Sequence, residues 1–201
     1  MRDQWAKDLF VRGEKITDHD TVYGINKLAF GSETEPKLIA ALRKSKSFVR
    51  GLSLVAVKEE KALGHALLTR AFIVNRGRRF KCLVLGPMAV LPEYQKQGIG
   101  KKLMEEGFER AKELGFTAIA VLGHETYYPK FGFIPASQKN IKTSFKVPDE
   151  NFMIVELVPN ALKGISGMVE YPREFLRIST AEPKPPAVAE QTEVKEQSPE
   201  Q

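Results

Sequence analysis

The chain has 201 residues, of which 42% are hydrophobic and 28% are charged, a balance typical of one soluble globular domain. Lysine and arginine total 31 against 25 aspartate and glutamate, and this excess of positive charge favours an anionic ligand or partner. The sequence has no run of about 18 apolar residues and no signal-peptide core at its N-terminus. Its only cysteine, Cys82, excludes an internal disulfide. We therefore expect a cytoplasmic protein that is neither exported nor embedded in a membrane.

The first fifty residues predict a short strand followed by two helices. Residues 10–16 favour a strand, after which Thr17 and Asp18 are typical helix-capping residues. Apolar side chains then recur at helical spacing twice, on either side of a break at residues 30–35. The buried faces of these two helices are expected at Val22, Ile25, Leu28 and Ala29, and at Leu38, Ile39 and Leu42.

The middle of the chain predicts a sheet that begins with hairpins. The favoured strands are residues 52–57, 62–74 and 80–91. A charged turn separates the first two strands, and Asn75-Arg76-Gly77 is a hairpin signal between the second and the third. A helix follows, with an apolar stripe at Ile99, Leu103, Phe108, Ala111 and Leu114 and with Gly115 as its C-cap.

The remaining elements complete one mixed domain. The apolar run 118–122 is typical of a strand covered on both faces, so that residues 83–122 form a strand–helix–strand unit with a parallel pair. A short helix, a late strand and a packed terminal segment are expected at residues 127–131, 152–157 and 161–171. The fold class is therefore α/β (α+β), a single domain over residues 1–179 with a mixed sheet flanked by helices. Residues 180–201 lack aromatic side chains and are expected to be a disordered tail.

The most informative segment lies where the strand over residues 80–91 leads into the next helix. It ends in Gln95-Lys96-Gln97-Gly98-Ile99-Gly100, and glycines at a helix start let backbone N–H groups converge on a phosphate. A P-loop is excluded because Lys102 follows Gly100-Lys101 where Ser or Thr is needed. A dinucleotide fingerprint is excluded because Leu103 stands at the third glycine position.

A second block supports one particular reading of this loop. The motif Gln95-x-x-Gly98-x-Gly100 resembles the acetyl-coenzyme-A signature of the GCN5-related N-acetyltransferases. Tyr127-Tyr128-Pro129-Lys130-Phe131-Gly132-Phe133 resembles the late Tyr-x-x-x-Gly-Phe block of the same family, and the two occur in the family's order. Together with the ending of the domain at residues 164–172, this block looks similar to the YhbS-like branch of predicted acetyltransferases.

The resemblance implies a binding site for acetyl-coenzyme A on a splayed sheet. Gly86-Pro87 interrupts an apolar strand, and because proline cannot donate to a ladder it marks a bulge or a splayed strand. Backbone amides of Met88, Ala89 and Val90 would then pair with the pantetheine arm, as an added strand would. The pyrophosphate would rest on the loop residues Gln95, Lys96, Gln97, Gly98, Ile99, Gly100 and Lys101.

The resemblance also implies that Tyr128 protonates the leaving thiolate, with the adjacent Tyr127 as the alternative. The general base stays open. Many relatives place a glutamate on the central strand, whereas residues 82–91 contain no carboxylate. The candidates are His124, Glu125, Glu33, Glu35 and a water relay. His65 and His19 are interpreted as structural or exposed.

The function expected from these motifs is transfer of an acetyl group from acetyl-coenzyme A to a primary amine, by direct attack in a ternary complex. No cluster of metal ligands is present, so no metal is implied. The alternative is a non-catalytic sensor of acyl-coenzyme A, motivated by the missing carboxylate. A third hypothesis, nucleic-acid binding, starts from basic residues crowded around one hairpin at Arg70, Arg76, Arg78, Arg79 and Lys81, which we interpret as a solvated hairpin. The acceptor and the oligomeric state, a homodimer included, stay open.

Overall fold

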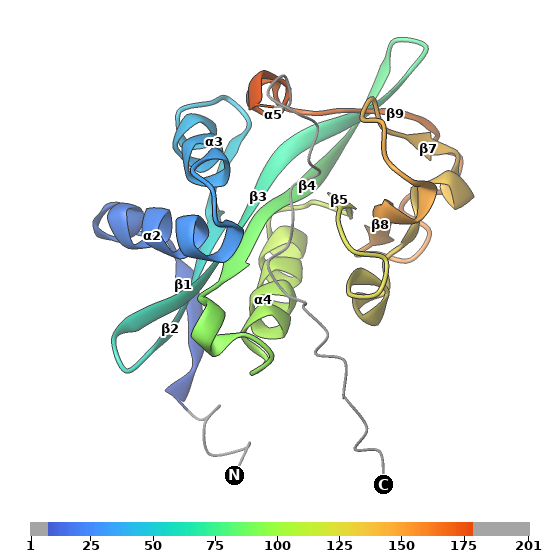
Figure 1. The fold of residues 1–201 in the computed structure, drawn as a ribbon. Helices are drawn as coiled ribbons and strands as arrows, with labels where there is room; N and C mark the ends of the chain where they lie inside the picture. Colours follow the sequence, from blue (N-terminus) through green and yellow to red (C-terminus); the bar gives the residue numbers. More distant parts are fainter. Residues whose placement is uncertain (1–7, 179–201) are drawn as a thin grey trace, which may run out of the picture.

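A long antiparallel pair of strands, β3 (Lys61–Asn75) and β4 (Arg78–Val90), is the centre of the fold. The structure is a computed structural model that describes residues 8–178 (Figure 1). Arg76 and Gly77 join the two strands with φ angles of 46° and 79°, as a two-residue hairpin with both central residues left-handed requires. The hairpin predicted at residues 75–77 is therefore confirmed.

The sheet extends on both sides of this pair. β2 (Phe48–Lys58) pairs antiparallel with β3, and β1 (Phe10–Gly13) pairs antiparallel with β2. On the other side β5 (Ala118–Leu122) runs parallel to β4, connected to it through α4 (Ile99–Glu113). β8 (Phe152–Glu156) and β6 (Ile134–Pro135) then continue the sheet antiparallel. The mixed sheet with a parallel crossover pair is thus confirmed.

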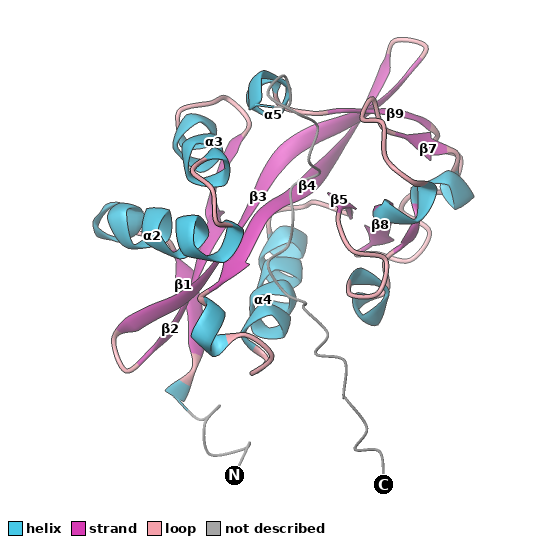
Figure 2. Cartoon of the chain, in the orientation of Figure 1, coloured by secondary structure: helices cyan, strands magenta, loops and turns pink. Residues whose placement is uncertain are grey.

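Helices cover the two faces of this sheet. α2 (His19–Phe30) and α3 (Thr34–Arg43) lie on one side of the β3–β4 pair, and α4 lies on the other (Figures 1 and 2). Successive residues of β3 face opposite sides of the sheet, as Gly64 and His65 show. A Cβ on Gly64 would lie 3.0 Å from the Ile99 side chain of α4, whereas the ring of His65 faces the Asn26 amide of α2 at 3.3 Å.

The end of the described chain returns to the central hairpin. β9 (Gly167–Glu170) pairs antiparallel with β3 and parallel with β7 (Ile141–Lys142), and α5 (Arg173–Ile178) follows. The expected packed segment at residues 161–171 is confirmed: Leu162 and Tyr171 are buried, and β9 is its strand. The tail predicted at residues 180–201 lies outside the described residues. Within residues 8–178 no helix combines the length and the apolar character that a membrane crossing needs.

Three details of the sequence prediction are wrong. The first strand ends at Gly13, and Ile16, expected in the strand, is 85% exposed in a 3₁₀ turn. Leu28 is 63% exposed because it lies outside the stripe of α2 that contains Val22 and Ile25. Leu114, expected in the apolar stripe of α4, follows the last residue of that helix and is 46% exposed. Asp18 occupies the N-cap position of α2, as predicted, but its side chain makes no cap bond to that helix. Its carboxylate instead accepts hydrogen bonds from the Lys15 N–H at 2.7 Å and from Arg12.

Candidate active site

The central strand β4 is interrupted where the sequence predicts it. Pairing of β4 with β3 is regular up to Leu85 and resumes at Met88, so that Gly86 and Pro87 lie opposite the single residue Leu67. Gly86 has a φ of 147°, which favours glycine. The bulge inferred from Gly86-Pro87 is therefore confirmed.

One edge of β4 has no partner strand beyond this bulge. Within the described residues β5 pairs with β4 only at residues 83–85, whereas β4 continues to Val90. Met88, Ala89 and Val90 pair only with β3, through Ala66, His65 and Gly64 respectively. The splay leaves a strand edge of the kind that can accept an extended ligand as an additional strand.

The glycine loop follows this edge directly. A 3₁₀ turn at Pro92–Tyr94 leads into it, and the Gln95 side-chain amide donates a hydrogen bond to the Val90 carbonyl at 3.2 Å. Gln95 therefore ties the loop to the last residue of β4. Lys96 and Gly98 both have left-handed backbones, with φ angles of 60° and 85°, which curls the chain immediately before α4.

The start of α4 presents backbone donors. The hydrogen bond from the Lys102 N–H to the Gly98 carbonyl, at 3.1 Å, is the first of the helix. It follows that the N–H groups of Ile99, Gly100 and Lys101 have no acceptor inside the helix. No acidic residue lies in this first turn, and no atom lies within 4 Å of where a Cβ on Gly98 would be. A helix start of this kind, with N–H groups that no helix carbonyl accepts and no carboxylate in its first turn, is suited to an anion.

The tyrosine pair lies beyond the end of β5. Tyr128 begins a 3₁₀ turn, Tyr128–Phe131, and its side chain is fully buried. The rings of Tyr127 and Phe133 each lie 5.3 Å from that of Tyr128, centroid to centroid. A Cβ on Gly123 would lie only 2.2 Å from Cε2 of Tyr128. The ring of Tyr128 therefore rests on the glycine that directly follows β5, in a tightly packed position.

Asn151 fixes the loop that contains the two exposed base candidates. Its side-chain amide donates to the Gly123 carbonyl at 2.9 Å and to the Glu125 carboxylate at 3.0 Å. In return the Gly123 N–H donates to the Asn151 carbonyl at 2.9 Å. His124 and Glu125 are both solvent-exposed in this loop. Sequence reasoning missed Asn151, because nothing near residue 151 indicates a contact with residues 123–125.

The two other acidic candidates lie at the start of α3. Glu33 forms ion pairs with Lys27 at 2.8 Å and with Lys37 at 3.0 Å. The hydrogen bond from Lys27, with that from Lys37, lowers the pKa of Glu33 to about 2. Glu33 is therefore a poor proton acceptor near neutral pH. One carboxylate oxygen of Glu35 is buried and has no hydrogen-bond partner among the described residues.

The lone cysteine and the basic hairpin behave as structural features. Cys82 is fully buried, and burial raises the pKa of its thiol to about 12, which makes it inert as a nucleophile. In the hairpin, the Arg79 guanidinium pairs with Glu170 at 2.9 Å and lies 4.2 Å from the centroid of the Phe72 ring. The Lys81 ammonium lies 4.7 Å from the centroid of the Phe116 ring. These contacts support the interpretation of a structural, solvated hairpin.

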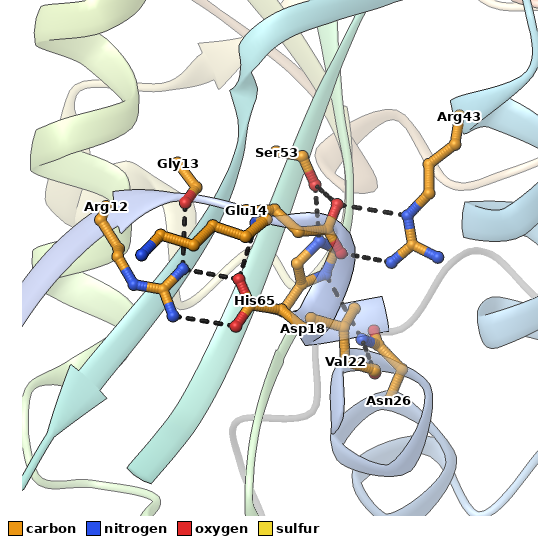
Figure 3. Close-up of polar contacts among 10 residues, drawn as sticks. Arg12, Gly13, Glu14, Asp18, Val22, Asn26, Arg43, Ser53 and His65 are labelled. Carbon is orange, nitrogen blue, oxygen red and sulfur yellow. Dashed lines mark hydrogen bonds and ion pairs between the residues drawn. The ribbon is translucent and has the colours of Figure 1, made fainter. Parts of the chain in front are cut away.

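A buried polar cluster on the α2 face of the sheet was also missed from the sequence (Figure 3). His65 is fully buried, with its ring nitrogens 3.0 Å from the Ser53 hydroxyl and 3.3 Å from the Asn26 amide. The Ser53 hydroxyl donates to Glu14 at 2.7 Å, and Glu14 also forms an ion pair with Arg43. These five residues come from five separate segments of the chain, so no local sequence pattern predicts the cluster.

Comparison with known proteins defines the class to which this fold and site belong. The profile of the acetyltransferase (GNAT) family matches residues 20–133, which is more than half of the chain. The chain therefore belongs to the GNAT family, as the sequence motifs predicted. It is similar to the uncharacterized N-acetyltransferase YjhQ of Escherichia coli K12, with 39% identity over 140 residues that cover 68% of this chain and 77% of YjhQ.

The YhbS branch is similar in both sequence and structure. The uncharacterized N-acetyltransferase YhbS of E. coli K12 is 28% identical over 170 residues, which cover 84% of this chain and 99% of YhbS. The crystal structure of E. coli YhbS in complex with CoA matches with a TM-score of 0.79 at 27% identity, over 85% of this chain and 93% of that one. A GNAT acetyltransferase from Brucella melitensis in complex with acetyl-CoA matches with a TM-score of 0.67 at 27% identity, over 83% and 97% of the respective chains. The expected fold, a splayed mixed sheet flanked by helices, is confirmed.

Proposed function

We propose that this protein binds acetyl-coenzyme A and transfers its acetyl group to a primary amine. The observation that carries the proposal is that an unpaired strand edge and a helix start with free N–H groups lie next to each other at the end of β4. The unpaired edge of β4 at Met88–Ala89–Val90 leads directly into the curled loop and open helix start at residues 95–101. Related structures of this family that contain CoA or acetyl-CoA support the choice of ligand.

The two parts of the site suit the two ends of such a ligand. An anionic pyrophosphate fits the convergent N–H groups of the loop from Gln97 to Lys101, and Lys96, Lys101 and Lys102 add positive charge there. The pantetheine arm carries two amides and fits the free edge of β4 as an added strand. In this arrangement the thioester carbonyl lies near Met88 and Ala89, where the backbone N–H of Met88, which points away from β3, stabilises the oxyanion.

The reaction then proceeds by direct attack. The lone pair of the neutral amine forms a bond with the thioester carbonyl carbon, and the carbonyl π electrons move to oxygen. Collapse of this tetrahedral intermediate breaks the C–S bond and releases a thiolate, which takes the hydroxyl proton of Tyr128. The ordinary pKa of a phenol, about 10, lies only about 1.5 units above that of a thiol, about 8.5, so this proton transfer is uphill by only about 2 kcal/mol and a phenol can serve as the acid. The proton lost by the amine passes to His124, to Glu125 or to solvent water.

The test is a coenzyme A release assay over a panel of primary amines. The wild-type protein should turn over at least one amine. Tyr128→Phe should lower kcat by about 10²-fold or more with little change in the affinity for coenzyme A, since general acid catalysis contributes about 10²–10⁴-fold. Tyr127→Phe, in the same aromatic cluster, tests the alternative acid: it should retain turnover if Tyr128 is the acid, and a loss in Tyr127→Phe alone would assign that role to Tyr127. Binding without turnover over the whole panel would instead favour an acyl-coenzyme-A sensor, and full activity of Tyr128→Phe would exclude Tyr128 as the acid.

A further inference from the structure

The free edge of β4 depends on β3 for its position. Beyond the bulge it is held on β3 by three registered pairs, which join Met88 to Ala66, Ala89 to His65, and Val90 to Gly64, and by the hydrogen bond from the Leu91 N–H to the Leu63 carbonyl. No other strand of the described chain pairs with residues 88–90. His65 is therefore the central anchor residue for the part of β4 on which the thioester is proposed to rest.

The side chain of His65 is itself held at both ring nitrogens. Nε2 lies 3.0 Å from the Ser53 hydroxyl, and Nδ1 lies 3.3 Å from Nδ2 of Asn26. The Asn26 amide also donates to the Val22 carbonyl at 2.8 Å, which fixes its nitrogen as the atom that faces His65. Nδ1 must then accept, so the proton of the neutral ring is on Nε2 and is donated to Ser53.

Each partner of His65 is fixed in turn (Figure 3). The Ser53 hydroxyl, which accepts from His65, donates its proton to Glu14 at 2.7 Å. Glu14 directly follows β1, and it accepts further hydrogen bonds from Arg43 at the end of α3. The hydrogen bonds that run from Asn26 through His65 and Ser53 are all donated in the direction of the Glu14 carboxylate. The network therefore connects β1, β2, α2 and α3 to one point on β3.

We propose that His65 is a positioning residue for acetyl transfer. Through Ser53, Glu14 and Asn26 it fixes the position of β3 opposite Ala89. In this way it fixes the edge of β4 that presents the thioester to the acceptor. The inference rests on the proposed function, because it concerns the same site. It assigns His65 no contact with substrate, since both of its ring nitrogens are engaged by Ser53 and Asn26.

The test separates binding from turnover. His65→Leu removes both hydrogen bonds and should lower kcat by about tenfold or more, because small displacements at a reacting centre have large effects on rate. Affinity for coenzyme A, measured by calorimetry, should change less than kcat, because the loop at residues 95–101, on which the pyrophosphate is proposed to rest, is joined to this edge only by the Gln95 side chain and the chain itself. His65→Gln can still donate to Ser53 and should recover part of the lost kcat, with a pH profile of the wild-type shape.

Thr69→Val is the matched control. Thr69 lies on the same strand, is equally buried and pairs with Val84 on the other side of the bulge. Its hydroxyl has no hydrogen-bond partner among the described residues, so valine should leave kcat unchanged. Ser53→Ala provides a second test if His65→Leu does not fold. It breaks the same chain of hydrogen bonds without altering a residue that pairs with β4, and it too should lower kcat.

The outcomes separate this inference from the proposed function. An active wild-type protein with a folded His65→Leu variant of equal kcat would overturn the positioning role alone. An equal loss in Thr69→Val would also overturn it, because the effect would then be general to buried substitutions in β3. A wild-type protein that turns over no amine would overturn the proposed function, and the positioning role with it.

Discussion

Substitution of Gly123 by alanine tests how tightly the tyrosine pair is held. The new Cβ would lie 2.2 Å from Cε2 and 3.0 Å from Cδ2 of Tyr128. Ordinary carbon contacts begin at about 3.5 Å, so the ring must move by roughly 1.3 Å. The glycine backbone cannot easily yield instead, because Asn151 holds its N–H and its carbonyl at 2.9 Å each.

The Tyr128 ring has little room for this displacement. It is fully buried between Tyr127 and Phe133, and overpacking of such a site costs about 1–3 kcal/mol. Urea unfolding of Gly123→Ala should therefore show a loss of stability in this range. If the Tyr128 hydroxyl protonates the leaving group, a shift of about 1 Å should also lower kcat by up to about 10²-fold.

Two further variants make the reasoning falsifiable. Gly24→Ala places the same methyl group in α2, where no atom lies within 4 Å of it, and it should stabilise the protein by about 0.5–1 kcal/mol. Adding Gly123→Ala to Tyr128→Leu should cost much less than adding it to the wild-type protein, because the clashing ring is gone. Unchanged stability and kcat in Gly123→Ala would refute the packing argument, and additive losses in the double variant would refute its assignment to Tyr128.

Three more variants follow from the described contacts. Burial lowers the pKa of His65 from an ordinary 6.5 to about 4, so the stability that neutral His65 contributes is complete above pH 6.5 and is lost as the pH falls toward 4. The difference in unfolding free energy between the wild-type protein and His65→Gln should therefore shrink over this interval, by roughly 3 kcal/mol in total, and a difference independent of pH would contradict the assignment. Gly167→Ala should lower the free energy of unfolding, measured in urea, by more than about 1 kcal/mol. The new Cβ would lie 2.2 Å from the Val74 carbonyl oxygen, and the residue would have to keep a φ of 142°. An unchanged free energy of unfolding would show that β9 does not pair with β3 as described. Asn151→Ala should cost about 1–3 kcal/mol by leaving the Gly123 carbonyl unsatisfied, and thermal unfolding at the wild-type temperature would count against that hydrogen bond.

Features with a local physical cause could be predicted from the sequence. The hairpin at residues 75–77 follows from the left-handed backbones that its turn residues tolerate, and the bulge follows from a proline that cannot donate to β3. The loop from Gln95 to Gly100 could be predicted in part, because Gly98 favours the left-handed backbone before the helix start, whereas the left-handed backbone of Lys96 has no such local signal. In each case the cause lies within a few residues along the chain.

The features that were missed arise from contacts between distant segments. His65 is 39 residues from Asn26 and 12 from Ser53, so its hydrogen bonds exist only once α2 and β2 have packed on β3. Asn151 reaches residues 123 and 125 for the same reason. Leu28 is expected on the buried face of α2 because of its spacing from Ile25. It is exposed because the sheet covers only the narrower stripe of the helix that contains Val22 and Ile25.

The central claim is that one strand edge and the loop after it hold the same ligand, and a crystal structure of this protein with coenzyme A tests it most directly. The account predicts the pantetheine arm hydrogen-bonded along residues 88–90, with the pyrophosphate on the N–H groups between Gln97 and Lys101. Coenzyme A bound elsewhere, or a strand edge and loop left empty at saturating ligand, would contradict it.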